Sequence, residues 1–280
     1  MNKTRIILVL FLTSCISEQH EFIMKAEKQP YLLQNHGDER IDNYYWMRDD
    51  SRDDPKVIEY LKNENKLSLE WFKSKFDHQS EIVDELLGQV PDIEISFPIK
   101  NKDYSYYQKL YKKDQLPLYY FKTNKDEEIL YLDPNIKLQE QEYYSIGKIS
   151  PSPDNSLIAY TEDNNGRREY DIRIIDTSTL NILNDSISNA SYDVIWSNDT
   201  EYFIYLKKDP TTLINNSVYV HKIGTSEEED VLIYKEVDPE FNINLYTSKT
   251  KMYAYIDIDS TNSNEIRLIE LNNPLNEPYI

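Results

Sequence analysis

The residues that could perform covalent catalysis are few and poorly spaced in this 280-residue sequence. A nucleophilic serine of the hydrolase type needs a Gly-x-Ser-x-Gly turn, which holds its side chain clear of the backbone between a strand and a helix. The only Gly-x-Ser is Gly224-Thr225-Ser226, and Glu228 stands where the second glycine is required. We interpret this segment as a solvated turn that leads into an exposed acidic loop, 227–230.

Metal-binding patterns are also missing from the sequence. One cysteine excludes a disulfide within the chain and a cysteine-based zinc site. The segment Asp163-Asn164-Asn165-Gly166 lacks the spacing and the terminal glutamate of a calcium loop. No histidine has a partner at metal-ligand spacing, and His36 is expected to be a structural hydrogen-bonding residue. The four histidines are His20, His36, His78 and His221. We therefore predict no catalytic, cofactor-binding or metal-ligating residue.

Charge and composition exclude further classes of function. The sequence has 31 Lys and Arg against 50 Asp and Glu, a formal charge of −19. Nucleic-acid binding needs a basic face, so we predict no nucleic-acid partner. An acidic field can still attract basic ligands. The five glycines cannot form a phosphate-binding loop, whereas 24 tyrosines favour a folded chain over a disordered one.

The first residues have the pattern of a bacterial lipoprotein signal. Lys3 and Arg5 precede a short apolar run, 6–12, which is followed by Thr13-Ser14-Cys15. We predict a signal peptide with a lipobox over 1–15, lipidation at Cys15 and a polar tether over 16–28. The protein would then lie in the cell envelope, on the periplasmic or outer-membrane side, touching the membrane only through its lipid anchor. The alternatives are an ordinary secretory signal or a wrong start codon, which give a soluble periplasmic or cytoplasmic protein.

A helical segment is predicted over 29–91. Asp54 is a suitable N-cap before Pro55, and apolar residues then recur at three- and four-residue steps as far as Phe76. A second helix is expected from about 80 to 87, with Gly88 as its C-terminal cap and Pro91 closing the helical region.

Short strands and turns alternate from 92 to 280, and one unit recurs. Residues 152–160 match 197–205, and a weaker third copy is 247–255, so the copies begin 45 and 50 residues apart. A period of roughly 40–50 residues built from short strands is typical of a β-propeller. We predict a mainly β fold: a helical segment followed by an incomplete β-propeller of three to four blades. The alternative is an open β-sandwich.

Specific motifs carry a resemblance to a known family. The run 36–50, HGDERIDNYYWMRDD, resembles the N-terminal signature of the prolyl oligopeptidase family, in particular its oligopeptidase B (protease II) branch. The helix that begins at Pro55 is similar to the first helix of that family. The segments 143–147, 196–199 and 209–213 are similar to parts of its propeller.

The resemblance implies a serine oligopeptidase whose α/β-hydrolase domain, with Ser, Asp and His, follows the propeller. That catalytic domain would lie beyond Ile280 and is absent from this chain. We therefore expect the propeller-containing part of an oligopeptidase, truncated before its catalytic domain and inactive alone. The implied partners are short basic peptides, cleaved after Arg or Lys by the parent, and a separately encoded catalytic domain. The alternative is a membrane-tethered half-propeller that binds peptides or proteins.

Overall fold

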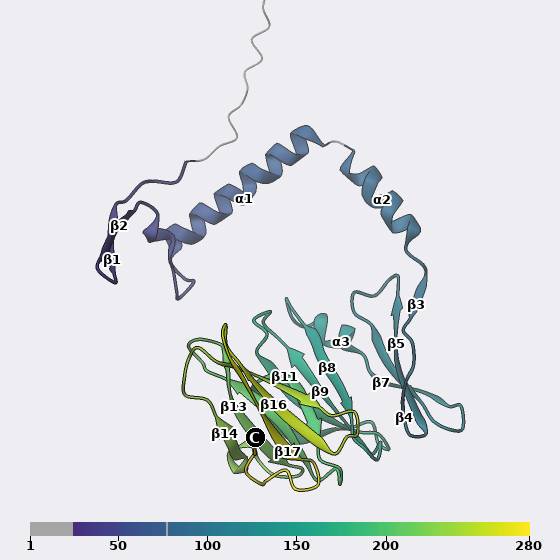
Figure 1. Cartoon of the computed structure of the whole chain (residues 1–280). Helices are drawn as coiled ribbons and strands as arrows, with labels where there is room; N and C mark the ends of the chain where they lie inside the picture. Colours follow the sequence, from purple (N-terminus) through teal and green to yellow (C-terminus); the bar gives the residue numbers. More distant parts are fainter. Residues whose placement is uncertain (1–24, 77) are drawn as a thin grey trace, which may run out of the picture. The chain divides into compact units, whose positions relative to one another are not determined.

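The computed structural model describes residues 25–280 except residue 77 (Figure 1). The predicted signal peptide, the lipidation site Cys15 and the tether before residue 25 lie outside the described residues. The chain divides into two compact units, Met1–Gln89 and Val90–Ile280. In the described part of the chain, none of the helices combines the length and apolar character of a membrane span.

The first unit begins with a hairpin that the sequence reasoning missed. Strands β1 (Tyr31–Asn35) and β2 (Asp38–Asp42) pair antiparallel across the turn His36-Gly37. Both turn residues have positive φ, 52° and 82°. A two-residue hairpin turn requires this conformation, and glycine adopts it without strain. The backbone of His36 therefore forms part of this turn.

Two helices follow the hairpin and the short 3-10 turn η1 (Tyr45–Met47). Helix α1 (Pro55–Lys75) begins as predicted, with the Asp54 side chain accepting a hydrogen bond from the Lys56 backbone N–H at 2.8 Å. Helix α2 (Gln79–Gln89) includes Gly88, so the prediction that Gly88 caps this helix is wrong. Val57 is the one buried residue among those described in this unit.

The second unit consists of antiparallel sheets that form four blades. The first blade is a five-stranded sheet. A seven-stranded sheet contains the second and third blades, and a three-stranded sheet forms the fourth. The first sheet contains β3 (Ile93–Ile95), β4 (Ile99–Asn101), β5 (Tyr104–Tyr111), β6 (Leu118–Lys122) and β7 (Glu128–Leu132). The seven-stranded sheet contains β8 (Ser145–Pro151), β9 (Leu157–Asp163), β10 (Tyr170–Asp176), β11 (Ile182–Trp196), β12 (Tyr202–Lys208), β13 (Asn215–Lys222) and β14 (Val231–Lys235). The three-stranded sheet contains β15 (Asn242–Thr247), β16 (Tyr253–Asp259) and β17 (Asn264–Glu270).

Strand β11 explains why two blades share one sheet. It is 15 residues long, and its first half pairs with β10 while its second half pairs with β12. The last strand of the second blade therefore continues directly into the first strand of the third. Elsewhere the blades are joined by connections: α3 (Pro134–Leu138) lies between β7 and β8, and a loop joins β14 to β15.

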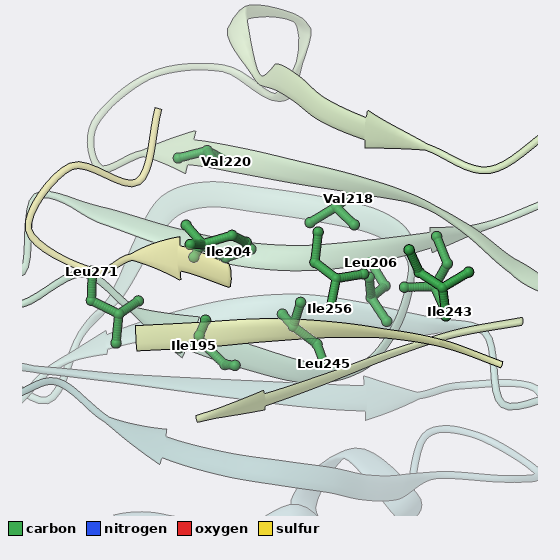
Figure 2. Packing of buried hydrophobic residues seen from close by; sticks show 12 residues of the cluster. Ile195, Ile204, Leu206, Val218, Val220, Ile243, Leu245, Ile256 and Leu271 are labelled. Atoms are coloured by element: carbon green, nitrogen blue, oxygen red, sulfur yellow. The ribbon is translucent and has the colours of Figure 1, made fainter. Parts of the chain in front are cut away.

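Three apolar cores fill the spaces between successive blades. Figure 2 shows the core between the third and fourth blades, in which Ile204 and Leu206 of β12 lie near Leu245 and Ile256. The other side of β12 contributes Phe203 and Tyr205 to the core shared with the second blade. Successive side chains of a strand point to opposite faces. Strand β12 is therefore buried on both faces, as expected for a strand between two packed sheets.

A serine-closed turn explains the repeat seen in the sequence. The Ser152 N–H donates to the Leu157 carbonyl, and the Ser152 hydroxyl accepts from the Leu157 N–H at 3.0 Å. The same pair of bonds joins Ser197 to Tyr202 and Ser248 to Tyr253. The third copy thus begins one residue later than the sequence alignment placed it.

That shift of register changes which residue of the third copy is buried. The residue equivalent to the buried Tyr160 and Tyr205 is Ile256, which is also fully buried, whereas Tyr255 is only half-buried. Tyrosine was therefore a misleading marker for the end of the third copy.

Candidate functional site

A cavity of about 670 Å³ lies in the second unit. All four blades contribute to its wall: the first blade through β4 to β7, the second mainly through β8, the third mainly through β11, and the fourth through Thr247, Lys251 and Leu271. Representative lining residues are Lys100 of β4, Lys148 of β8, Val194 of β11 and Thr247 of β15. Its volume falls in the range of about 300–1,000 Å³ that is usual for ligand pockets.

Polar contacts between blades fix the wall of this cavity. The Asn101 side-chain amide donates to the Ser152 carbonyl at 2.9 Å, which ties the first blade to the second. The Trp196 indole N–H donates to the Ser150 carbonyl at 2.8 Å, between the second and third blades. The Asn198 backbone N–H donates to the Leu271 carbonyl, which joins the third blade to the fourth. These three hydrogen bonds thus connect each blade to the next at the cavity wall.

Two irregular strand pairings meet at the cavity wall. The register of β8 against β9 shifts between Ile146 and Ile149, so that Gly147 and Lys148 leave the regular ladder. The Lys148 backbone N–H donates instead to the Thr161 hydroxyl at 2.7 Å. A methyl group at Gly147 would lie 2.5 Å from this same hydroxyl oxygen. Glycine at this position is therefore required by close approach.

The second irregularity lies in β11, opposite the first. Its pairing with β12 shifts between Ala190 and Val194, and the shifted residues include Tyr192 and Asp193. The Lys148 ammonium lies 2.6 Å from an Asp193 carboxylate oxygen and 5.9 Å from the centre of the Tyr192 ring. Bulges re-aim side chains and are frequent beside functional sites. Here they bring Lys148 into the wall of the cavity.

The charge of the wall is opposite in sign to that of the whole chain. Three lysines line the cavity, Lys100, Lys148 and Lys251, and no aspartate or glutamate does. Among the described residues, Lys148 is paired with Asp193, whereas Lys100 and Lys251 form no ion pair. The whole chain carries a charge of −19. The cavity is thus a locally cationic surface within an acidic protein.

Aromatic side chains form a further part of the wall and remain uncharged. Tyr106, Tyr107, Tyr119, Tyr131 and Trp196 all line the cavity. Burial raises the pKa of Tyr119 to about 12, and it raises the pKa of the Tyr106 and Tyr131 phenols further. These hydroxyl groups therefore stay protonated at neutral pH, and the lysines alone set the charge of the lining.

A buried histidine cluster lies between the second and third blades. His221 of β13 is fully buried, and its Nδ1 lies 2.6 Å from Asp230 while its Nε2 lies 3.4 Å from Asp185. Burial opposes the charged imidazolium, but the hydrogen bonds and charges of both carboxylates outweigh it and raise the pKa of His221. The Tyr205 hydroxyl donates to the second oxygen of Asp230 at 2.7 Å.

A second buried polar cluster holds the second blade together. The Glu162 carboxylate is buried and accepts hydrogen bonds from Lys137, Tyr144 and Arg173 at 2.6 to 3.0 Å. Burial alone would raise the pKa of Glu162, but these bonds and the Lys137 charge lower it. The carboxylate is therefore ionised and fully paired, which gives it a structural role.

The structure scatters the residues that the sequence singled out. Ser226 leads into the short 3-10 helix η2 (Glu227–Glu229), far from any catalytic arrangement, and its N–H donates to Glu229 at 3.3 Å. The run 227–230 is not simply an exposed loop, because Glu227 pairs with Lys207 and Asp230 with the buried His221.

The segment 163–166 also has a defined structural role. Asp163 is buried, and its carboxylate accepts the backbone N–H groups of Asn165, Gly166 and Arg168 in the loop after β9. No group of residues suited to hold a metal ion occurs in the described part of the chain.

The three cavity lysines were missed by sequence reasoning. Lys100, Lys148 and Lys251 are far apart in sequence and belong to no motif. The one available signal was Gly147, since an isolated glycine in a strand pattern indicates a bulge or a close backbone approach.

Comparison with known proteins identifies the family to which this propeller belongs. Residues 25–279 match the family model described as "Prolyl oligopeptidase, N-terminal beta-propeller domain". The chain therefore belongs to the prolyl oligopeptidase family. Two curated relatives are the dipeptidyl aminopeptidase BI of Pseudoxanthomonas mexicana, 31% identical over 86% of this chain, and protease 2 of Moraxella lacunata, 30% identical over 89%.

A solved structure with the same fold is the oligopeptidase B of Leishmania major, with a TM-score of 0.78 at 25% identity over 88% of this chain. The chain spans 36% and 37% of the length of the two curated relatives and 37% of this solved structure. The mainly β fold with an incomplete propeller predicted from the sequence is confirmed, and residues 25–279 match the N-terminal propeller domain of the family.

Proposed function

We propose that this chain provides the propeller part of a serine oligopeptidase and has no hydrolytic activity on its own. The observation that carries the proposal is the match of residues 25–279 to the propeller domain of a peptidase family, over little more than a third of the length of its relatives. The parent enzyme would act on short peptides and cleave after Arg or Lys. The acidic chain, with its charge of −19, is suited to attract such basic peptides.

The arrangement of residues supports a binding role better than a catalytic one. Covalent peptidase chemistry needs a nucleophile, a base within hydrogen-bond reach and donors for the oxyanion. Among the described residues, Ser226 has no such base, and His221 is enclosed by two carboxylates and the Phe203 ring. The cavity wall offers cationic and aromatic groups, which bind ligands without cleaving them.

The test uses the purified chain with chromogenic peptides that end in Arg or Lys. We expect no turnover and no labelling by a fluorophosphonate probe, and turnover on co-expression with an oligopeptidase B-type catalytic domain. Labelling of any serine in the purified chain would overturn the proposal. So would a failure of every such catalytic domain to form a complex with the chain.

A separately encoded catalytic domain is the proposed partner of the first unit. Helices α1 and α2 expose apolar side chains that nothing in their own unit covers. The most prominent are Leu69, Phe72, Ile82 and Leu86. Apolar surface of this kind favours association. We expect the isolated chain to dimerise or aggregate, and to gain stability from the partner. A sharply melting monomer would contradict this.

We also propose lipidation at Cys15 and a location in the cell envelope. The support is the basic start, the apolar run too short to span a bilayer, and the single cysteine directly after small residues. Mass spectrometry of the mature N-terminus should find a diacylated Cys15, and Cys15→Ser should remain uncleaved and unlabelled. An unmodified N-terminal peptide that contains Met1 would overturn the proposal.

A membrane-tethered binding module is the second candidate function. The cavity favours it, because a binding role needs only that site and no catalytic domain. The DNA downstream of this reading frame separates the two candidates. A neighbouring frame with Gly-x-Ser-x-Gly and a late histidine supports the oligopeptidase, and an unrelated gene after a clean stop supports the binding module.

A further inference from the structure

We propose that the cavity of the propeller binds a carboxylate group of a short peptide, using Lys100, Lys148 and Lys251, while its aromatic wall holds an adjoining apolar side chain. This inference rests on the proposed function only in taking a peptide as the ligand. The three ammonium groups lie on three different blades, so the site exists only in the assembled propeller.

The first argument is electrostatic. The cavity lining contains three lysines and no carboxylate, in a chain with 50 acidic and 31 basic residues. A carboxylate would be repelled by most of the surface and attracted here. Lys100 and Lys251 form no ion pair within the described residues, so they are free to take an anionic ligand.

The second argument is the way in which Lys148 is positioned. The Asp193 carboxylate and the Tyr192 ring hold its ammonium group, and the two irregular strand pairings place all three residues together. Asp193 neutralises much of this one charge, so Lys148 serves mainly as an oriented hydrogen-bond donor. Lys100 and Lys251 supply the net positive charge.

The third argument is the chemistry of the remaining wall. Tyr107, Tyr119 and Trp196 offer large apolar surfaces with protonated polar tips, which suit peptide side chains and backbone groups. Every unmodified peptide carries a carboxylate at its C-terminus, and a peptide with an apolar last residue carries an apolar group beside it. An acidic side chain could supply the same group, so the experiment compares both sources.

The test measures binding by calorimetry with three tripeptides and the full chain. The first is N-acetylated alanyl-alanyl-phenylalanine with a free C-terminal carboxylate, and the second is its C-terminal amide. The third is acetyl-alanyl-glutamyl-phenylalanine amide, which carries its carboxylate on a side chain. At low salt we expect the acid to bind roughly tenfold more tightly than the amide, as expected for two partly exposed ion pairs. This difference should shrink to about twofold at 0.5 M salt, because salt screens exposed charges.

A double variant and a matched control locate the site. Lys100→Gln with Lys251→Gln should weaken binding of the acid about tenfold and leave the amide unchanged. Lys102→Gln with Lys249→Gln removes the same charge from the same two hairpins, β4–β5 and β15–β16, at residues outside the cavity lining, and should retain tight binding. Equal unfolding midpoints for both double variants exclude a loss of fold.

Equal affinity for the acid and the amide would overturn the proposal, as would wild-type affinity in the Lys100→Gln, Lys251→Gln variant. Tight binding of the glutamyl amide would assign the site to any carboxylate, and weak binding would restrict it to the C-terminus; either result supports the proposal. Binding is measured without turnover, so the proposed oligopeptidase function and this site can fail independently.

Discussion

The two units of the chain treat apolar side chains in opposite ways. In Val90–Ile280, three continuous cores separate four blades, and strands such as β12 are buried on both faces. In the first unit, α1 and α2 expose most of their apolar residues, and Val57 alone is buried among those described. A long helix gains most of its stability from packing an apolar face. The first unit therefore has secondary structure without a core of its own, and the second has both.

The largest expected contrast is between two phenylalanines. Phe203 is fully buried between Trp196 and His221, so Phe203→Ala should lower the free energy of unfolding of the second unit by about 4 kcal/mol. Phe72 of α1 is 49% exposed, so Phe72→Ala should cost less than about 1 kcal/mol. Urea unfolding of each variant measures both values. Equal losses of unfolding free energy in the two variants would show that the apolar face of α1 is covered in solution, and the two units would then not differ in this respect.

The next contrast is between a buried and an exposed carboxylate. Glu162→Gln leaves the Lys137 and Arg173 charges without their partner and should cost about 3 kcal/mol. Because the folded pKa of Glu162 is lowered, its stabilisation is present above the unfolded carboxyl pKa and is lost as pH falls through the folded value. Glu27→Gln removes an exposed pair with Lys56 and should not change the unfolding midpoint. This account would be contradicted if the free energy of unfolding of Glu162→Gln fell at acid pH as steeply as that of the wild type.

A smaller effect is expected from the buried histidine as pH rises. The folded pKa of His221 is raised, so its stabilisation is fully present below the unfolded pKa of about 6.5 and is lost as pH rises through the folded value. The wild-type free energy of unfolding should therefore fall with pH above about 6.5. His221→Gln should flatten that fall, whereas His78→Gln, at an exposed position beside Glu81, should not. Unfolding titrations from pH 5 to 9 would show which histidine is responsible.

The smallest effect tests the start of α1. Asp54→Ala removes the side-chain acceptor of the Lys56 N–H and should cost about 1 kcal/mol of local helix stability. Hydrogen exchange should become faster in the first turn of α1 and stay unchanged in the blades. Glu70→Ala, in the middle of the same helix, is the matched control and should leave exchange in that turn unaltered. Faster exchange in the blades would mean that the two units are coupled.

Much of the fold was predictable from local patterns. The Asp54-Pro55 helix start, the β10, β13 and β17 strands and the repeated turns all depend on residues close together in sequence. The hairpin at His36-Gly37 was missed because its two strands are short and polar. Gly88 failed as a cap because α2 continues through it. The third repeat was placed one residue early because Tyr255 was matched to Tyr160, whereas the serine of the turn sets the register.

The cavity was beyond prediction because its residues meet only through the arrangement of the blades. Lys148 and Asp193 are 45 positions apart and touch only because both strands depart from regular pairing. The histidine cluster was missed for the same reason, since Asp185 lies 36 positions before His221. Patterns along the chain reveal which residues form a strand, but not which strands lie together.

Strand β11 also determines how the propeller can move. Because one unbroken strand belongs to the second and third blades, those blades share a continuous hydrogen-bonded ladder and cannot separate without breaking it. The joints around α3 and the loop from β14 to β15 contain no such ladder. Thermal breathing that widens the cavity should therefore concentrate at these two joints. We therefore expect the four blades to move as three units, in which the second and third blades move together.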